Sequence, residues 1–191
     1  MRISGGIAKG RNMRTAKAFA KKGRDDELRP TSAKVRKAIF DILGQRIVGS
    51  NFLDLYAGSG AVGIEALSRG SACVAFVEEC SFRSEAIRDL TIKFGLGDRA
   101  IMFRDKTARF LKKQKITFDI IFIDPPYASR ELDMVLPLIG KSGVLNNNGV
   151  AVVEHSSRNP LPPLVGRLKL VKNYRYGDTS LSVYKKMLSL S

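Results

Sequence analysis

The sequence has few of the residue types that build metal sites and disulfide scaffolds. Its 191 residues include one histidine, His155, and two cysteines, Cys73 and Cys80. One histidine gives little support to a zinc site or to a histidine-based catalytic triad, and we expect His155 in a loop after a strand. Two cysteines are too few for a disulfide framework. We therefore expect no metal, and two free thiols in a reducing cytoplasm.

Long hydrophobic runs are also absent. No apolar run approaches the roughly 18 to 20 residues of a membrane span, and the first residues contain no apolar stretch of signal-peptide length. These absences predict a cytoplasmic protein that does not contact a membrane. The hydrophobic content of 44% is ordinary for a globular protein. A chain of this length can bury a core without disulfides or a metal, and we expect a monomer.

Acidic residues are missing from the N-terminal region, where basic residues are abundant. Residues 1–24 contain eight lysines and arginines but no aspartate or glutamate. The whole chain has 33 basic and 18 acidic residues, a formal net charge of +15. A positive field concentrated in one region favours a polyanion as partner, and nucleic acid is the usual one. The alternative is a solvated basic surface that only aids solubility.

The pattern of the first 46 residues predicts a small N-terminal unit. Within residues 1–15, polar and apolar residues alternate on either side of Gly5-Gly6, which predicts a short hairpin. Residues 16–28 are polar and basic, which predicts a loop. Pro30 then opens a helix with apolar residues at helical spacing, which Gly44 can end. We therefore divide the chain into a basic hairpin, loop and helix at 1–46 and a larger domain at 47–191, within one compact unit.

From residue 51 onward, apolar strands alternate with helices. The expected strands are 51–56, 72–77, 100–103, 118–123 and 150–154, followed by an antiparallel pair at 168–174 and 180–184. The expected helices are 61–69, a stretch from Phe82 to Phe94, a basic helix ending at Lys113, and 131–140. This alternation predicts an α/β fold with a mostly parallel sheet and helices on both faces. Ligands of such sheets bind beyond the carboxyl ends of the strands.

A glycine-rich motif lies between the first predicted strand and its helix. Gly58-Ser59-Gly60-Ala61-Val62-Gly63 matches the pattern in which a ligand approaches bare backbone at a tight turn. Glu78 ends the next strand, 18 residues after Gly60, where a carboxylate can accept both ribose hydroxyls. Asp54 lies four residues before Gly58, and an acid there suits the cationic S-adenosyl-methionine better than a pyrophosphate. The motif therefore favours S-adenosyl-methionine, with a nicotinamide cofactor as the alternative.

A second motif, Asp124-Pro125-Pro126-Tyr127, follows the most apolar predicted strand. The prolines hold the turn extended and lack an N–H, so nearby carbonyls keep free lone pairs. The turn thus offers a carboxylate and a carbonyl as acceptors, beside an aromatic ring. An exocyclic base amine has two N–H donors and a flat ring that can stack on a tyrosine. This motif predicts methyl transfer to a base amine, and the alternative is a turn that merely ends the strand.

Together with these two motifs, further stretches along the chain resemble the sequence pattern of one protein family. They are Arg2-Ile3, Gly5-Gly6, Lys9-Gly10-Arg11, Leu28-Arg29-Pro30-Thr31, Val35-Arg36, Ile39-Phe40-Asp41-Ile42-Leu43, Leu53 to Gly60, Gly63 to Gly70, Asp124 to Tyr127, Tyr176 to Thr179, and Tyr184. In these residues the chain resembles, nearly end to end, the RsmD-type 16S ribosomal RNA guanine-N2-methyltransferases of bacteria. The resemblance implies a seven-stranded, Rossmann-like class I methyltransferase sheet at 47–191 and an RNA-binding hairpin in front of it.

The resemblance also implies a set of site residues. The cofactor contacts would be Asp54, Ala57, Gly58, Ser59, Gly60, Glu78 at the ribose and Asp105 near the adenine, and the guanine amine would lie at Asp124, Pro125, Pro126 and Tyr127. The basic residues expected to contact RNA are Arg2, Lys9, Arg11, Arg14, Arg29 and Arg36. The partner would be ribosomal RNA or a small-subunit assembly intermediate. The stretch 16–26 is longer and richer in lysine than the family pattern, so no RNA contacts are carried over to it.

Three other functions stay open at this point. The Asp-Pro-Pro-Tyr motif also serves adenine, so an adenine-N6-methyltransferase acting on DNA or RNA is an alternative. A non-catalytic RNA-binding assembly factor on the same fold is another, although Asp54, Glu78, Asp124 and Tyr127 are all present. A nicotinamide oxidoreductase is the third. The resemblance along the whole chain favours methyl transfer to guanine.

Overall fold

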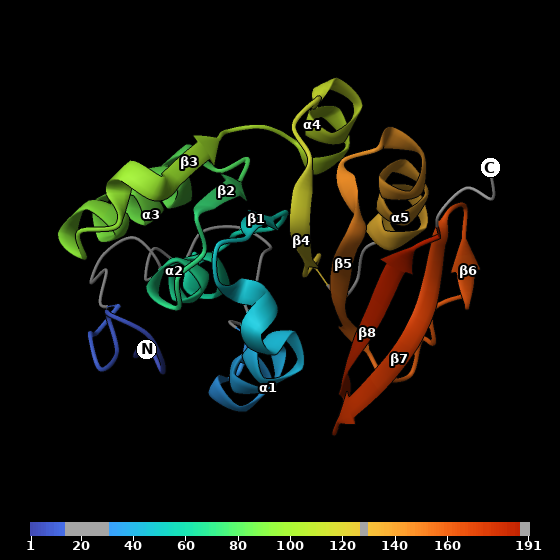
Figure 1. The fold of residues 1–191 in the computed structure, drawn as a ribbon, viewed down its shortest axis with the longest axis horizontal. Coiled ribbons are helices and arrows are strands. Elements are labelled where there is room, and N and C mark those ends of the chain that lie inside the picture. Colours follow the sequence, from blue (N-terminus) through green and yellow to red (C-terminus); the bar gives the residue numbers. More distant parts are fainter. Residues whose placement is uncertain (14–30, 127–129, 188–191) are drawn as a thin grey trace.

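The computed structural model describes residues 1–13, 31–126 and 130–187, which form one sheet covered by helices (Figure 1). The sheet has the order β3-β2-β1-β4-β5-β8-β7-β6. Its strands are β1 Asn51–Asp54, β2 Cys73–Val77, β3 Ala100–Phe103, β4 Phe118–Ile123, β5 Leu145–Ser156, β6 Leu164–Val165, β7 Leu168–Tyr176 and β8 Thr179–Lys186. The first five are parallel, and the last three pair antiparallel.

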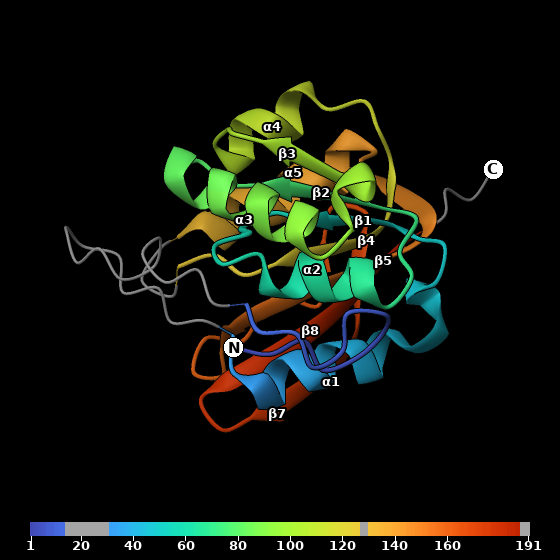
Figure 2. The same cartoon turned by 90° about the vertical axis from the view of Figure 1, so that its left-hand side faces the viewer.

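Helices cover both faces of this sheet, as the alternating pattern predicted. They are α1 Ala33–Leu43, α2 Ala61–Ser68, α3 Ser81–Lys93, α4 Thr107–Lys113 and α5 Glu131–Ser142, with short 3-10 turns η1 Gly44–Ile47 and η2 Gly97–Arg99. Side chains of α1, α2 and α3 share one core cluster with residues 3–13, while α4 and α5 pack in a second cluster on the opposite face. Figure 2 shows the N-terminal segment lying with α1 and α2 on the first face. In the described part of the chain, no helix is long and apolar enough to cross a membrane.

The class I methyltransferase fold is confirmed, but the sheet has eight strands where seven were expected. The additional strand, β6, contains only Leu164 and Val165 and pairs with the start of β7. Two residues are too few to produce an alternating pattern, so this strand could not be predicted from the sequence. His155 was also expected in a loop, and this was wrong. Pairing with β8 extends β5 as far as Ser156, and His155 is buried with its Nε2 2.8 Å from Ser182 Oγ.

The N-terminal hairpin exists only in reduced form. A single antiparallel bridge joins Arg2 to Asn12, and turns occupy most of the residues between them. The segment nevertheless packs tightly, because Ile3, Ala8 and Met13 are buried in the first core cluster. At Gly6, which has a φ of +76°, an added Cβ would lie 1.8 Å from the Ser68 carbonyl oxygen. Residues 1–13 are therefore part of the folded core.

A buried ion pair connects this segment to α1 and α2. Arg36 Nε donates to Glu65 Oε2 at 2.8 Å, and Arg36 Nη2 donates to the carbonyl of Arg2 at 2.7 Å. Arg69 Nη2 donates to the other oxygen of Glu65 at 2.8 Å, and the Ser4 hydroxyl donates to the same oxygen. The Glu65 side chain is fully buried. Because a buried charge is costly unless paired and hydrogen-bonded, this cluster fixes how the three elements meet.

Candidate active site

Four acidic side chains gather at the carboxyl ends of neighbouring parallel strands. Asp54 is the last residue of β1, Glu78 follows β2, Asp124 follows β4, and Glu154 lies near the end of β5. Asp54, Glu78 and Glu154 are more than nine-tenths buried, and Asp124 is half-buried. Strands β2, β1, β4 and β5 are adjacent in the sheet, so their ends form one continuous edge. This edge is where ligands of such sheets bind.

The glycine-rich loop turns sharply between β1 and α2. Gly60 has a φ of +72° and donates its N–H to the Ala57 carbonyl at 2.6 Å, while Ala57 donates to the carbonyl of Val77 at 3.1 Å. A Cβ at Gly60 would lie 2.8 Å from Ile87 Cγ1, so a side chain there would meet both strain and a clash. Ser59 is half-buried in the same turn. The loop therefore presents backbone to the edge that holds the acidic residues.

Asp54 lies under this loop as a buried carboxyl group. Its Oδ2 accepts the N–H of Gly63 at 3.0 Å, in the first turn of α2. Burial raises the pKa of Asp54 to about 7, the Gly63 hydrogen bond opposes this, and the Glu78 charge adds to it. A desolvated carboxylate is stabilised by a cation placed beside it. The site thus fits a cationic ligand such as S-adenosyl-methionine.

Glu78 closes the loop from the second strand. Its Oε2 accepts the N–H of Gly58 at 3.0 Å, and its Oε1 accepts the N–H of Cys80 at 2.9 Å and pairs with Arg83 at 2.9 Å. A carboxylate has about four acceptor positions, so these bonds orient the group and leave limited capacity for ribose hydroxyls. Asp105 lies beyond β3, the edge strand next to β2, and pairs with Arg109.

Asp124 is held at the end of β4 by a neighbour from the other side of the site. Thr31 Oγ1 donates to Asp124 Oδ2 at 3.1 Å, just ahead of the first turn of α1. Burial raises the pKa of Asp124 well above its ordinary value, and the charges of Glu154 and Asp54 raise it further. The sequence interpretation did not select Glu154 or Thr31. Glu154 could have been predicted as a site residue, because it is an acidic residue near the carboxyl end of a predicted parallel strand.

The other three residues of the Asp-Pro-Pro-Tyr motif differ in their exposure to solvent. Pro125 is buried and Pro126 is exposed beside Asp124, while Tyr127 lies outside the described residues. Cys73 and Cys80 are free thiols. No cluster of three or more histidine, cysteine or acidic side chains in the described ranges could hold a metal ion.

The expected RNA contacts fall into three groups. Arg2, Lys9 and Arg11 are exposed on the N-terminal segment. Arg14 and Arg29 lie outside the described residues. Arg36 is only 2% exposed and is paired with Glu65, so its guanidinium is committed to the core. The sequence placed Arg36 next to the apolar stripe of its helix, and the expectation of an RNA contact was wrong because the carboxylate that buries it comes from α2.

Known proteins are similar to this chain both in sequence and in fold. The family model described as conserved hypothetical protein 95 matches residues 1–185. YlbH of Bacillus subtilis, whose name as a ribosomal RNA methyltransferase is provisional, is 34% identical over 189 residues, covering 97% of this chain and 99% of that protein. Ribosomal RNA small subunit methyltransferase D of Escherichia coli K12 is 31% identical over 161 residues, covering 83% and 80%.

A solved structure agrees with these relatives. The Escherichia coli protein yhhF, provisionally described as a methyltransferase, superposes with a TM-score of 0.83 at 29% identity and covers 98% of both chains. The match extends over the N-terminal segment, the glycine-rich loop and the closing antiparallel strands alike. The chain therefore belongs to the conserved hypothetical protein 95 family, the RsmD-type methyltransferases.

Proposed function

We propose that this protein transfers a methyl group from S-adenosyl-methionine to the exocyclic N2 amine of a guanine in small-subunit ribosomal RNA. The observation that carries the proposal is the placement of Asp124 at the edge that also holds Asp54, Glu78 and the glycine-rich loop. The base amine and the methyl donor would then meet at adjacent strand ends. The named ribosomal RNA methyltransferases among the relatives support RNA as the substrate.

Asp124 and the prolines after it supply acceptors for the amine. The Asp124 carboxylate accepts one N–H, and a backbone carbonyl of the Pro125-Pro126 turn accepts the other. These two bonds direct the nitrogen lone pair toward the methyl carbon. The nitrogen would take the methyl group as the bond from carbon to sulfur breaks, and the Asp124 carboxylate, whose pKa is raised, would accept the extra proton from nitrogen. Thr31, just ahead of α1, donates to the Asp124 carboxyl group and holds it in place.

The other end of the site would hold the methyl donor, whose methyl group is electrophilic because the sulfonium sulfur can leave as a neutral thioether. Asp54 provides a desolvated carboxylate for the cationic part of that donor. Gly58 and Gly60 allow close approach to backbone, and Glu78 provides acceptors for ribose. Asp105, at the end of the edge strand, is the proposed contact for the adenine.

The direct test is methylation with labelled S-adenosyl-methionine of small-subunit RNA, free and in assembled particles, followed by mass analysis of the nucleosides. We expect label in N2-methylguanosine. Label in N6-methyladenosine would replace guanine by adenine as the target. A protein that binds RNA but transfers no label would be an assembly factor. Titration with a nicotinamide cofactor in parallel tests the oxidoreductase alternative.

Replacing Glu78 with glutamine is expected to weaken cofactor binding by about 5- to 150-fold, which corresponds to one lost acceptor for a buried hydroxyl. Glutamine keeps the shape of the side chain but loses the charge that pairs with Arg83 at 2.9 Å. Isothermal titration calorimetry measures the affinity directly. Asp98→Asn, in η2 outside the site, is the matched control and should bind like the wild type. Equal affinity for Glu78→Gln and the wild type would exclude the ribose assignment.

Cofactor affinity is expected to rise with pH and to level off above about pH 7. The raised pKa means that the free protein holds a proton on Asp54 below pH 7. A cation binds the carboxylate form, so that proton must leave, and affinity one pH unit below the pKa falls by about tenfold. Titrations in two buffers of different ionisation enthalpy should show nearly one proton released at pH 6 and almost none at pH 8. Asp54→Asn should bind weakly at both pH values, and a wild type without pH dependence would contradict the assignment.

A further inference from the structure

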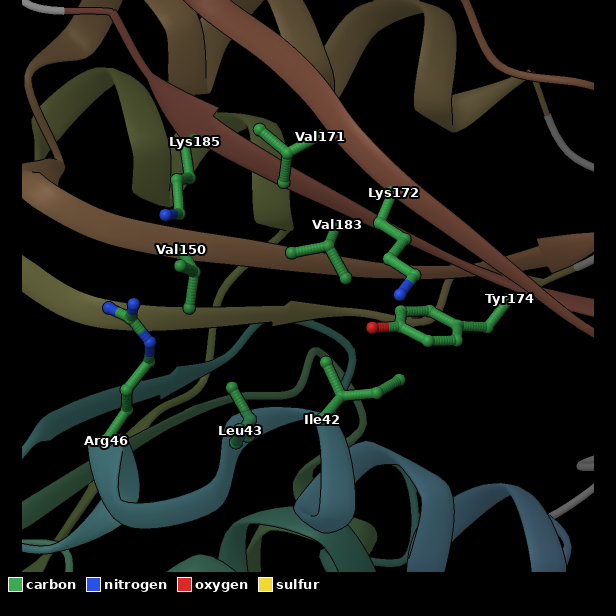
Figure 3. A pocket seen from close by; sticks show the side chains of 9 residues that line it. All are labelled: Ile42, Leu43, Arg46, Val150, Val171, Lys172, Tyr174, Val183 and Lys185. Atoms are coloured by element: carbon green, nitrogen blue, oxygen red, sulfur yellow. The ribbon is translucent and has the colours of Figure 1, made fainter.

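A groove separates α1 from the antiparallel strands of the sheet, away from the carboxyl-end edge (Figure 3). It has a volume of about 240 Å³. Its apolar lining comes from Ile42 and Leu43 of α1, Val150 of β5, Val171 of β7 and Val183 of β8. Val171 is 47% exposed, so part of this apolar lining is open to solvent. The groove is smaller than the roughly 300–1,000 Å³ of sites for drug-sized ligands, and suits a single flat ring or sugar.

Cationic side chains surround this apolar floor. Arg46 extends from η1 toward the strands, and Lys172 and Lys185 approach from β7 and β8 (Figure 3). Among the residues that the structure describes, none that lines the groove is acidic. None of the three cations forms an ion pair with any residue in the described part of the chain. Lys172 Nζ lies 5.0 Å from the centroid of the Tyr174 ring, a cation–π contact that holds its charge at one end of the groove.

A fourth cation adds to this field. Lys169 pairs directly with Lys185 across β7 and β8, and Lys185 pairs with Val150 on its other side. Side chains directly opposite each other leave the same face of a sheet, and like charges in that position are destabilising. None of the described residues that line the groove is a carboxylate that could neutralise this repulsion. An anion with several charges would remove the repulsion.

The groove and the candidate active site lie on the same face of the sheet, at different positions along β5. Val150 and Glu154 lie four residues apart on β5, so both side chains leave the same face, about 13 Å apart along the strand. Helix α1 follows the same direction. Thr31, ahead of its first turn, contacts Asp124, and Ile42 and Leu43 at its other end line the groove. A short flexible polyanion could therefore occupy the groove and reach Asp124.

We infer that this groove, defined by Arg46, Lys172, Lys185 and the apolar residues between them, binds a single-stranded RNA segment next to the methylated nucleotide. The inference rests on the proposed function, because that function brings an RNA base to Asp124. The cations pair with phosphates, and the apolar floor receives the face of a base or ribose. Phosphate contacts of this kind position the strand, while the pocket at Asp124 selects the base. An acidic protein segment would also neutralise these cations. Only RNA, however, would occupy both the groove and the amine-binding turn at Asp124 under the proposed function.

The test compares two triple variants that remove the same charge. In the groove variant Arg46, Lys172 and Lys185 are changed to glutamine, and in the control variant Lys112, Lys115 and Lys141, exposed in the α4–α5 region, are changed to glutamine. Binding of a fluorescent single-stranded fragment of small-subunit RNA is measured by anisotropy over a range of salt concentrations. Each lost phosphate contact lowers the slope of log affinity against log salt by about 0.7 for single strands. The groove variant should lose about two units of slope and the control variant much less.

Activity separates this inference from the proposed function. The groove variant should need a higher RNA concentration for half-maximal methylation and should keep wild-type turnover at saturating RNA and wild-type cofactor affinity. Thermal melting should show it folded, with stability equal to or above that of the wild type, since repulsion at Lys185 is relieved. Suppose that the wild type methylates RNA, but that the groove variant and the control variant have the same RNA affinity and the same slope of log affinity against log salt. The groove assignment then fails and the proposed function stands. If the groove variant loses binding of polyglutamate but not of RNA, the groove binds an acidic protein and the assignment also fails. If the wild type binds no RNA, both fail.

Discussion

The Asp124→Asn variant is expected to lose methyl transfer while binding the cofactor as the wild type does. Asparagine keeps the size of the side chain and can still accept from Thr31, which donates to Asp124 at 3.1 Å. It places an NH₂ group where the amine needs an acceptor, so the interactions that strengthen in the transition state are lost. Groups that accept or donate protons at a reacting centre contribute typically about 10²–10⁴-fold. Single-turnover methylation with saturating cofactor and RNA measures the loss.

A control variant and the pH dependence of turnover test whether the loss of activity comes from the Asp124 carboxylate. Asp178→Asn replaces a carboxylate that is 76% exposed between β7 and β8, and it should retain full activity. Wild-type turnover should also rise with pH as Asp124 loses its proton, because burial, Glu154 and Asp54 raise the pKa of this group. The Asp124→Asn variant should lack that rise. Wild-type turnover by Asp124→Asn would refute the role assigned to the carboxylate.

The sheet and the two ligand motifs were predictable because they are local patterns. Apolar strands such as Phe118–Ile123 alternate with amphipathic helices, and their carboxyl ends meet wherever the strands are parallel. Asp54, Glu78 and Asp124 could therefore be assigned to one edge before the fold was seen. The order of the strands and the neighbours of each acid in space are not local. Glu154 was missed for that reason, since its strand enters the site only through the pairing of β4 with β5.

The basic N-terminal region shows where composition was a poor guide. The charges of residues 1–24 predicted a region that contacts phosphate, but they did not indicate that residues 1–13 pack on α2 through Ile3, Ala8 and Met13. A deletion of the whole region would remove these core residues, so lost RNA binding could not be separated from unfolding. Arg36 was misassigned because its partner, Glu65, is 29 residues away in the sequence. Substitution of the exposed Arg2, Lys9 and Arg11 is the cleaner test of RNA contact.

Replacing Glu65 with glutamine is expected to destabilise the protein by about 3–5 kcal/mol, because it leaves the buried Arg36 charge without its partner. Arg36 is 2% exposed and cannot turn its guanidinium to solvent without leaving the carbonyl of Arg2. For a chain of this size each kcal/mol lowers the melting temperature by roughly 2–4 °C. Thermal unfolding should therefore shift down by roughly 6–20 °C. Amide exchange should accelerate first in residues 1–13, which contact the same cluster through Ser4.

Two further variants distinguish a lost charge pair from a general effect of the substitution. Asp41→Asn breaks the exposed Lys37–Asp41 pair on α1 and should change stability by less than about 0.5 kcal/mol. Adding Arg36→Met to Glu65→Gln removes the stranded charge, and replacement of a buried ion pair by apolar groups is often close to neutral. The double variant should therefore be more stable than Glu65→Gln alone, even though it contains one more substitution. If instead the two losses add, the cluster is not coupled, and the N-terminal segment must be held mainly by the packing of Ile3, Ala8 and Met13.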